Sequence, residues 1–290
     1  MPPHHHHHGS GSIHPYAFAV GIGLNLAFVV AEAAAGFISG SLALLADAGH
    51  NLSDVLGLVV AWGASRLARK PPSLRRTYGL RRSTIVAAQA NATILLLAIG
   101  GIAWEAIHRL TRPAPTEGMM MILVAGIGVL INGITARLFW RGRHHDLNIR
   151  GAFWHMTADA AVSLGVVLAG LLIHRTGLLW IDPLVSLAIV AVIAVSTWGL
   201  LRESFDLALD AVPRHVDPAA VRRYLEALPG IVGVHELHIW ATSTTEVALT
   251  VHLIKPDPRG DDQLLMTIMS ALREDFGIAH PTIQWERAGG

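Results

Sequence analysis

The sequence predicts an α-helical membrane protein with six transmembrane helices, followed by a small soluble α+β domain. Hydrophobic residues make up 52% of the 290 residues, charged residues only 15%, and the mean hydropathy is +0.47. These values are typical of a chain that is largely embedded in a membrane. Long apolar runs also stop near residue 200, beyond which proline and charged residues return. We therefore predict a transmembrane domain over 13–205 and a cytosolic C-terminal domain over 206–290.

The first twelve residues are set apart from both domains. His4 to His8 are followed by Gly-Ser-Gly-Ser, a pattern typical of an expression tag and spacer. We therefore assign 1–12 to a tag and leave its five histidines out of the search for metal ligands.

Six segments are apolar enough to cross the hydrocarbon core of a bilayer, which takes about 20 residues of helix. Each predicted span is followed by a short polar connection or, after the sixth, by the soluble domain. The predicted spans cover residues 16–37, 41–64, 84–107, 119–140, 152–173 and 179–200.

Basic residues are concentrated in two of the connections between spans. The other connections are poor in arginine and lysine, so the positive-inside rule places both termini in the cytoplasm. The basic residues between spans two and three are Arg66, Arg69, Lys70, Arg75, Arg76, Arg81 and Arg82, and those between spans four and five are Arg137, Arg141, Arg143 and Arg150.

The soluble part shows the order αββαβ. Asp217-Pro218 is typical of a helix start, with an N-capping aspartate and a proline in the first turn. Alternating apolar and polar residues predict strands after this helix. The expected elements are a helix over 217–228, strands over 231–241 and 246–254, a helix over 261–276 and a strand over 281–286.

Two short polar patterns interrupt the apolar spans. His50 and Asp54 stand four residues apart in the second span, and His155 and Asp159 repeat this spacing in the fifth. Residues i and i+4 share one helix face. Two such helices together would offer two nitrogen and two oxygen ligands, a tetrahedral set that suits Zn²⁺. Ordinary interhelical packing contacts are the alternative, but the recurrence of the pair favours a metal site.

Further polar groups lie at membrane depth. Glu32 and Asp47 are carboxylates within the first and second spans, where such a group must be protonated, paired or in contact with water. A role around the metal ligands and a purely structural role both remain open for them. The chain has no cysteine, so any metal must be held by histidine, carboxylate or backbone oxygen.

Several stretches together resemble the cation diffusion facilitator family of divalent-metal exporters. The resemblance implies six spans, a ferredoxin-like cytosolic domain, a homodimer in the bacterial inner membrane, and exchange of metal for protons. It assigns His50, Asp54, His155 and Asp159 as transport ligands, with Zn²⁺ preferred and Cd²⁺ tolerated. The matching stretches are 39–54, Tyr78-Gly79-Leu80-Arg81-Arg82, Leu147-Asn148 with 155–159, Asp182-Pro183 and 234–240.

The sequence also departs from the family pattern. Thr84 stands where many members have glutamate, and the loop between spans two and three has no His or Asp for the extra metal site that some members carry there. In the cytosolic domain, His235, His252, His280 and Glu286 resemble metal-binding positions of relatives. A regulatory Zn²⁺ site and ordinary structural histidines both remain open for these four residues.

These observations favour a secondary active transporter over an enzyme. A membrane-embedded zinc hydrolase would be expected to keep three ligands, an open water position and a nearby general base, often in a His-Glu-x-x-His motif, which this sequence lacks. A channel is disfavoured because four ligands would hold zinc too tightly for fast conduction. A metal sensor is the remaining alternative. Metal ion, protons and the lipid bilayer are the expected partners, with no role for nucleic acid.

Overall fold

The computed structural model describes residues 15–140, 147–256 and 262–287. The predicted tag at 1–12 and two of the predicted loop arginines, Arg141 and Arg143, lie outside the described residues. The described part contains six long helices, as predicted. They are α1 (Pro15–Ser39), α2 (Leu42–Ala68), α3 (Ser83–Thr111), α4 (Gly118–Phe139), α5 (Leu147–Thr176) and α6 (Ile181–Ala208).

Five of the six helices are longer than the predicted spans, and α4 is shifted by one residue at the same length. Helix α5 begins five residues before the predicted span, and α6 continues eight residues beyond it, because backbone hydrogen bonding persists where the side chains become polar. The helices α2 to α4 and α6, together with α5 from Phe153, are long and apolar enough to cross a membrane, and the described apolar part of α1 covers Leu26–Ser39.

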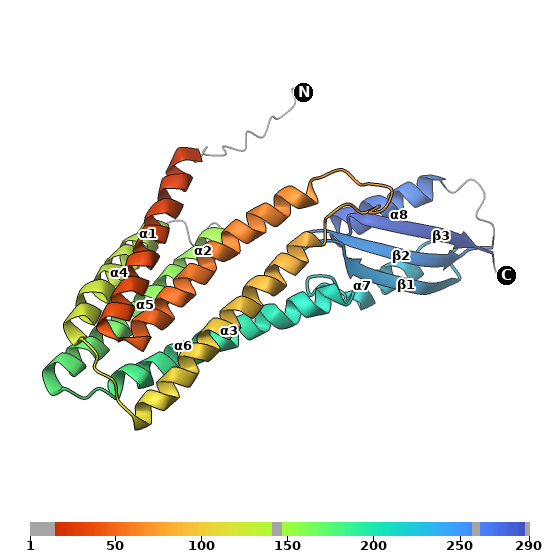
Figure 1. The fold of residues 1–290 in the computed structure, drawn as a ribbon. Coiled ribbons are helices and arrows are strands. Elements are labelled where there is room, and N and C mark those ends of the chain that lie inside the picture. The colour runs from red at the N-terminus through yellow and green to blue at the C-terminus, as the bar shows by residue number, and fades with distance from the viewer. Residues whose placement is uncertain (1–14, 141–146, 257–261, 288–290) are drawn as a thin grey trace. The chain divides into compact units, whose positions relative to one another are not determined.

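The chain divides into two compact units. The first contains α1, α2 up to Val55, α3 from Leu97, α4, α5 and α6 up to Ala194. Within it, α4 and α5 lie side by side along their length and α1 lies against α4 (Figure 1). Small residues permit this close packing: a Cβ atom on Gly118 would lie 2.5 Å from the carbonyl oxygen of Gly170.

The start of α2 is fixed by a residue from another helix. Asp182, in the first turn of α6, accepts hydrogen bonds from the Ser41 hydroxyl (2.6 Å) and from the backbone N–H groups of Leu42 (2.8 Å) and Ala43 (3.2 Å). The first N–H groups of a helix have no partner within the helix, and the helix dipole favours a negative charge there. This contact therefore anchors α2, the helix that carries His50 and Asp54.

The second unit contains the remaining parts of α2, α3 and α6 and the whole C-terminal domain. The domain follows the predicted αββαβ order, and Asp217 caps α7 by accepting a hydrogen bond from the backbone N–H of Ala219 (2.9 Å). The elements are α7 (Pro218–Glu226), β1 (Gly233–Ala241), β2 (Val247–Ile254), α8 (Asp262–Glu274) and β3 (His280–Glu286).

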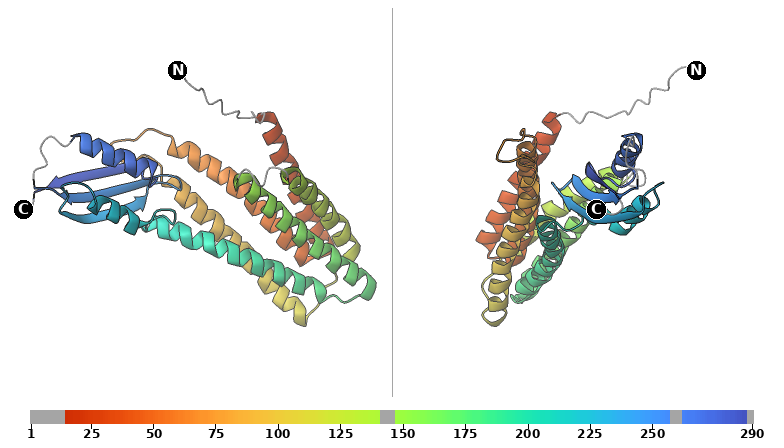
Figure 2. Two further views of the ribbon diagram at one scale, coloured as in Figure 1. Left: turned by 180° about the vertical axis from the view of Figure 1, so that it is seen from behind. Right: turned by 90° about the vertical axis from the view of Figure 1, so that its right-hand side faces the viewer.

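The C-terminal domain is a three-stranded sheet with two helices on one face (Figure 2). The strand order is β1-β2-β3; β2 pairs with β1 in antiparallel and with β3 in parallel fashion. Apolar side chains of β2, such as Leu249 and Leu253, are buried with Leu225 of α7 and Leu272 of α8. His252 lies on the other face of β2 because side chains alternate along a strand. That face is therefore free to carry polar ligands.

Candidate metal centres

Helices α2 and α5 bring together the four residues predicted as transport ligands. His50 Nε2 lies 3.4 Å from Asp159 Oδ1, and His155 Nε2 lies 3.2 Å from Asp54 Oδ2. The pairs within each helix are slightly wider, at 3.9 Å for His50 and Asp54 and 3.6 Å for His155 and Asp159. Each imidazole thus lies near the carboxylates of both helices.

These separations suit a single bound ion. Zinc bonds to imidazole nitrogen and carboxylate oxygen are about 2.0–2.2 Å long, so neighbouring ligand atoms of a tetrahedral site lie about 3.3–3.6 Å apart. Ligand atoms of Asp54, His155 and Asp159 all lie within 4.8 Å of one another, and His50 is not part of this group. His50 instead lies near Oδ1 of Asp159, whereas His155 lies near Oδ2. The ring centroids of His50 and His155 are 6.2 Å apart with an interplanar angle of 79°, so the two rings approach the same space from different directions.

The four residues differ in exposure. The Asp159 side chain is 5% exposed, that of His50 21%, that of Asp54 38% and that of His155 45%. Exposure therefore rises across the four side chains from Asp159, which is buried, to His155, which is the most exposed.

Two fully buried carboxylates accompany this set. Glu32 accepts a hydrogen bond from the Asn51 side-chain amide (3.2 Å), and Asp47 accepts one from the Ser163 hydroxyl (2.9 Å). Asp47 also interacts electrostatically with Asp159 and His50. The sequence analysis singled out both carboxylates but missed Asn51 and Ser163. Their spacing could have indicated them, because each follows an intramembrane carboxylate, Asp47 or Asp159, by one helical turn.

A second cluster lies on the open face of the C-terminal sheet. His235 on β1 pairs with His252 on β2 in the antiparallel register, and Glu286 ends β3. Glu286 Oε2 lies 2.8 Å from His235 Nε2, and Glu286 Oε1 lies 2.8 Å from His252 Nδ1. The hydrogen bond with His235, supported by the nearby His252, lowers the pKa of Glu286 below its ordinary value. The carboxylate therefore stays charged beside two imidazoles.

His280 does not join this cluster. It begins β3, whereas Glu286 ends it, and six residues of extended strand span about 20 Å. No single ion can bind both. His280 Nε2 instead lies 3.5 Å from Glu246 Oε2 and contacts the guanidinium of Arg81. The structure thus assembles three of the four predicted cytosolic ligands, His235, His252 and Glu286.

The loop between α2 and α3 is tied to the C-terminal domain through polar contacts. Arg81 pairs with Glu246, and Arg82 pairs with Asp210. Thr84, one of the departures from the family pattern, accepts a hydrogen bond from the backbone N–H of Thr244 (3.0 Å). The hydroxyl therefore serves as a contact to the hairpin between β1 and β2.

Comparison with family models covers both domains. Residues 18–207 match the cation efflux transmembrane domain, and residues 213–288 match the cation efflux protein cytoplasmic domain. The metal-bound C-terminal domain of the CzcD transporter from Cupriavidus metallidurans is 36% identical over 24% of this chain and 99% of that one, with a TM-score of 0.23.

Three curated relatives match this chain across both domains. The zinc transporter ZitB of Escherichia coli is 38% identical over 89% of this chain and 83% of the relative. The metal cation efflux system protein CzcD of Cupriavidus metallidurans is 36% identical over 90% of this chain and 83% of the relative. The cadmium, cobalt and zinc/H(+)-K(+) antiporter of Bacillus subtilis is 35% identical over 89% of this chain and 85% of the relative. With both domains matched and the predicted helices and sheet in place, the chain belongs to the cation diffusion facilitator family of integral membrane proteins for metal-cation efflux.

Proposed function

We propose that this protein exports Zn²⁺ from the cytoplasm in exchange for protons, with His50, Asp54, His155 and Asp159 as the ligands of the transported ion. One observation carries the proposal: two imidazoles and two carboxylates from two helices lie within 3.2–3.9 Å of their nearest partners across and along the helices. Two nitrogen and two oxygen donors favour Zn²⁺, and Cd²⁺ is the ion expected to substitute.

Metal and protons compete for the same atoms. An imidazole nitrogen binds metal only when it is unprotonated, and histidine titrates near physiological pH. A site that releases zinc on the outer side therefore takes up protons there and returns them to the cytoplasm. An inward proton gradient then drives export, and each net charge that crosses contributes about 2.3 kcal/mol per 100 mV.

The ligands also connect the two helices that must move. Asp159 and His155 belong to α5, whereas His50 and Asp54 belong to α2. A shift of α2 relative to α5 would separate the cross-helix pairs and weaken binding. Alternating access through such a shift is the transport mechanism we propose. Hydrolysis is disfavoured because four protein ligands would fill the tetrahedral coordination of zinc and leave no position for an activated water.

The setting of this site follows the same reasoning. We propose that both termini face the cytoplasm, since the arginine-rich connections fall on that side, and that the protein is a homodimer in the bacterial inner membrane, as its family implies. We further propose that His235, His252 and Glu286 bind Zn²⁺ as a regulatory ligand. A pure sensor would need only this second cluster, whereas a transporter needs the transport ligands His50, Asp54, His155 and Asp159.

Transport by reconstituted protein tests the proposal. Vesicles that contain a zinc dye are exposed to Zn²⁺ under imposed pH gradients of either sign. Wild-type protein and Asp262→Ala, which changes an exposed carboxylate of α8, should move zinc at rates that depend on the gradient. Asp159→Ala should not transport. Transport by Asp159→Ala, or rates that ignore the gradient, would contradict the proposal.

A further inference from the structure

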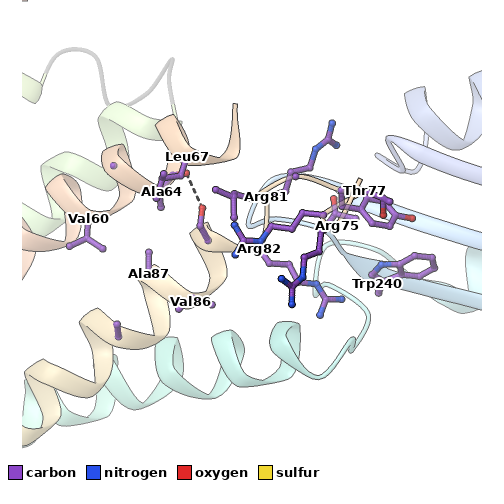
Figure 3. Close-up of a pocket in the computed structure, with 18 residues that line it drawn as sticks. Val60, Ala64, Leu67, Arg75, Thr77, Arg81, Arg82, Val86, Ala87 and Trp240 are labelled. Carbon is purple, nitrogen blue, oxygen red and sulfur yellow. Dashed lines mark hydrogen bonds between the residues drawn. The ribbon is translucent and has the colours of Figure 1, made fainter. Parts of the chain in front are cut away.

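A cavity of about 930 Å³ lies where α2 ends and α3 begins, next to β1 (Figure 3). One part of its wall is apolar and comes from these two candidate transmembrane helices. Gly63 has no side chain and that of Ala87 is a single methyl group, which leaves a groove between the helices, while Val60, Leu67 and Val86 border it. These three larger residues are 38%, 39% and 59% exposed. This wall therefore suits a hydrocarbon chain.

The other part of the wall is basic. Four arginines line it, and none of the described residues that line the cavity is acidic; the four are Arg75, Arg76, Arg81 and Arg82. Arg81 and Arg82 pair with carboxylates elsewhere in the same unit. Within the described part of the chain, no ion pair is recorded for Arg75 or Arg76, and both are exposed. Guanidinium groups bind phosphate through paired N–H donors, so these two suit an anionic headgroup.

The loop beside the cavity has a second feature typical of a membrane surface. Ser73 and Arg76 exchange two backbone hydrogen bonds of 3.0 Å, which form a tight turn with Leu74 inside it. Leu74 is fully exposed, and Tyr78, which also lines the cavity, is 54% exposed. An apolar side chain held outward next to Arg75 and Arg76 is unfavourable in water. At a bilayer surface it would be buried among lipid headgroups and acyl chains.

We propose that this cavity binds an anionic phospholipid, with its phosphate on Arg75 and Arg76 and an acyl chain in the groove between α2 and α3. Basic pockets next to transmembrane helices on the cytoplasmic side recognise anionic lipid headgroups in this way. The site is separate from the metal ligands and rests on the proposed orientation only in placing the lipid in the cytoplasmic leaflet. A bound lipid would connect the membrane to the loop that carries Arg81 and Arg82.

Native mass spectrometry of the delipidated full-length protein tests the headgroup contact. Phosphatidylglycerol should bind more tightly than phosphatidylcholine. The double variant Arg75→Gln/Arg76→Gln should bind phosphatidylglycerol about thirty-fold more weakly, at about 1 kcal/mol for each charge near an anionic surface. The control Arg112→Gln/Arg175→Gln removes two exposed arginines, one just after α3 and one in the last turn of α5, and should bind as wild type. Equal binding by both double variants, or no preference between the two lipids, would overturn the proposal.

A second pair of measurements separates a lipid from other occupants. Ala87→Leu fills the groove without removing charge and should weaken phosphatidylglycerol binding. Glycerol 3-phosphate, which has the phosphate but no acyl chain, should compete only weakly. Strong competition by glycerol 3-phosphate together with unchanged binding by Ala87→Leu would identify a site for free phosphate compounds. A change from dimer to monomer in Arg75→Gln/Arg76→Gln would instead identify a second copy of this chain as the occupant. Either result would overturn the lipid proposal.

Discussion

His50 Nε2 on α2 lies 3.4 Å from Asp159 Oδ1 on α5, closer than the 3.9 Å to Asp54 Oδ2 on its own helix. The same holds for His155, which is nearer to Asp54 than to Asp159. Each imidazole is therefore paired across the helix interface. A metal ion in this position would join the two helices, and losing one ligand would change both the affinity for the ion and the choice among ions.

His50→Asp should change metal selectivity. The substitution turns a set of two nitrogens and two oxygens into one nitrogen and three oxygens, which favours harder ions such as Mn²⁺ over Zn²⁺ and Cd²⁺. We expect the ratio of zinc to manganese transport to fall by about tenfold or more, since a ligand exchange worth about 1.4 kcal/mol gives that factor. Uptake of Zn, Cd, Mn, Fe and Co into vesicles measures the ratio.

A histidine outside the site provides the control for this experiment. His108 is exposed near the end of α3, so His108→Asp should leave the ratio unchanged. An unchanged ratio in His50→Asp would mean that His50 is not a ligand.

Asp182→Asn should destabilise the transmembrane domain. The amide can accept hydrogen bonds through only one atom, whereas the buried carboxylate accepts three at the start of α2. We expect a loss of about 2–4 kcal/mol in the free energy of unfolding. Thermal unfolding in detergent, followed by the helical circular dichroism signal, measures it. The exposed Asp262→Asn at the start of α8 loses only a charge near a helix N-terminus and should cost about 0.3–1 kcal/mol. Equal losses for the two variants would contradict this role of Asp182.

The sequence predicts the parts of the metal centres that depend on spacing within one element. The i,i+4 pairs identified His50, Asp54, His155 and Asp159. Contacts that depend on distant packing were not predicted. The sequence shows no reason why Asp182 should cap α2, and the two ends of β3 separate His280 from Glu286, although both are possible ligands.

The two histidines of β2 and β3 should differ in zinc binding by the cytosolic cluster. His252 lies beside Glu286, whereas His280 lies beside Glu246. In a background of Asp54→Ala and Asp159→Ala, which removes the membrane site, His252→Ala should weaken zinc binding by about a hundredfold or more. Changing a group that only supports a ligand already costs about 10–100-fold. His280→Ala should retain the affinity. Isothermal titration of zinc measures both, and equal losses would show that His280 takes part.

Glu286→Gln should change how stability depends on pH. The folded pKa of Glu286 lies below its ordinary value of 4.5 because of the hydrogen bond with His235 and the nearby His252. The charged carboxylate therefore stabilises the fold above pH 4.5, and this contribution is lost as the pH falls through the lowered pKa. Glu286→Gln should melt earlier than wild type near neutral pH in the presence of a chelator, and the two should converge in acid. A difference in melting temperature that stays the same at all pH values would contradict the lowered pKa of Glu286.

Gly118→Ala should disturb the contact between α4 and α5. A Cβ atom at this position would lie 2.5 Å from the carbonyl oxygen of Gly170 and 2.8 Å from the backbone nitrogen of His174, and backbone atoms cannot yield without moving a helix. Such overpacking costs about 1–3 kcal/mol. Gly126→Ala, on the same helix, meets no atom within 4 Å and should be neutral or slightly stabilising, since alanine favours helix more than glycine does. Thermal unfolding of the two variants side by side measures the difference, and because α5 carries His155 and Asp159, only Gly118→Ala should also slow zinc transport.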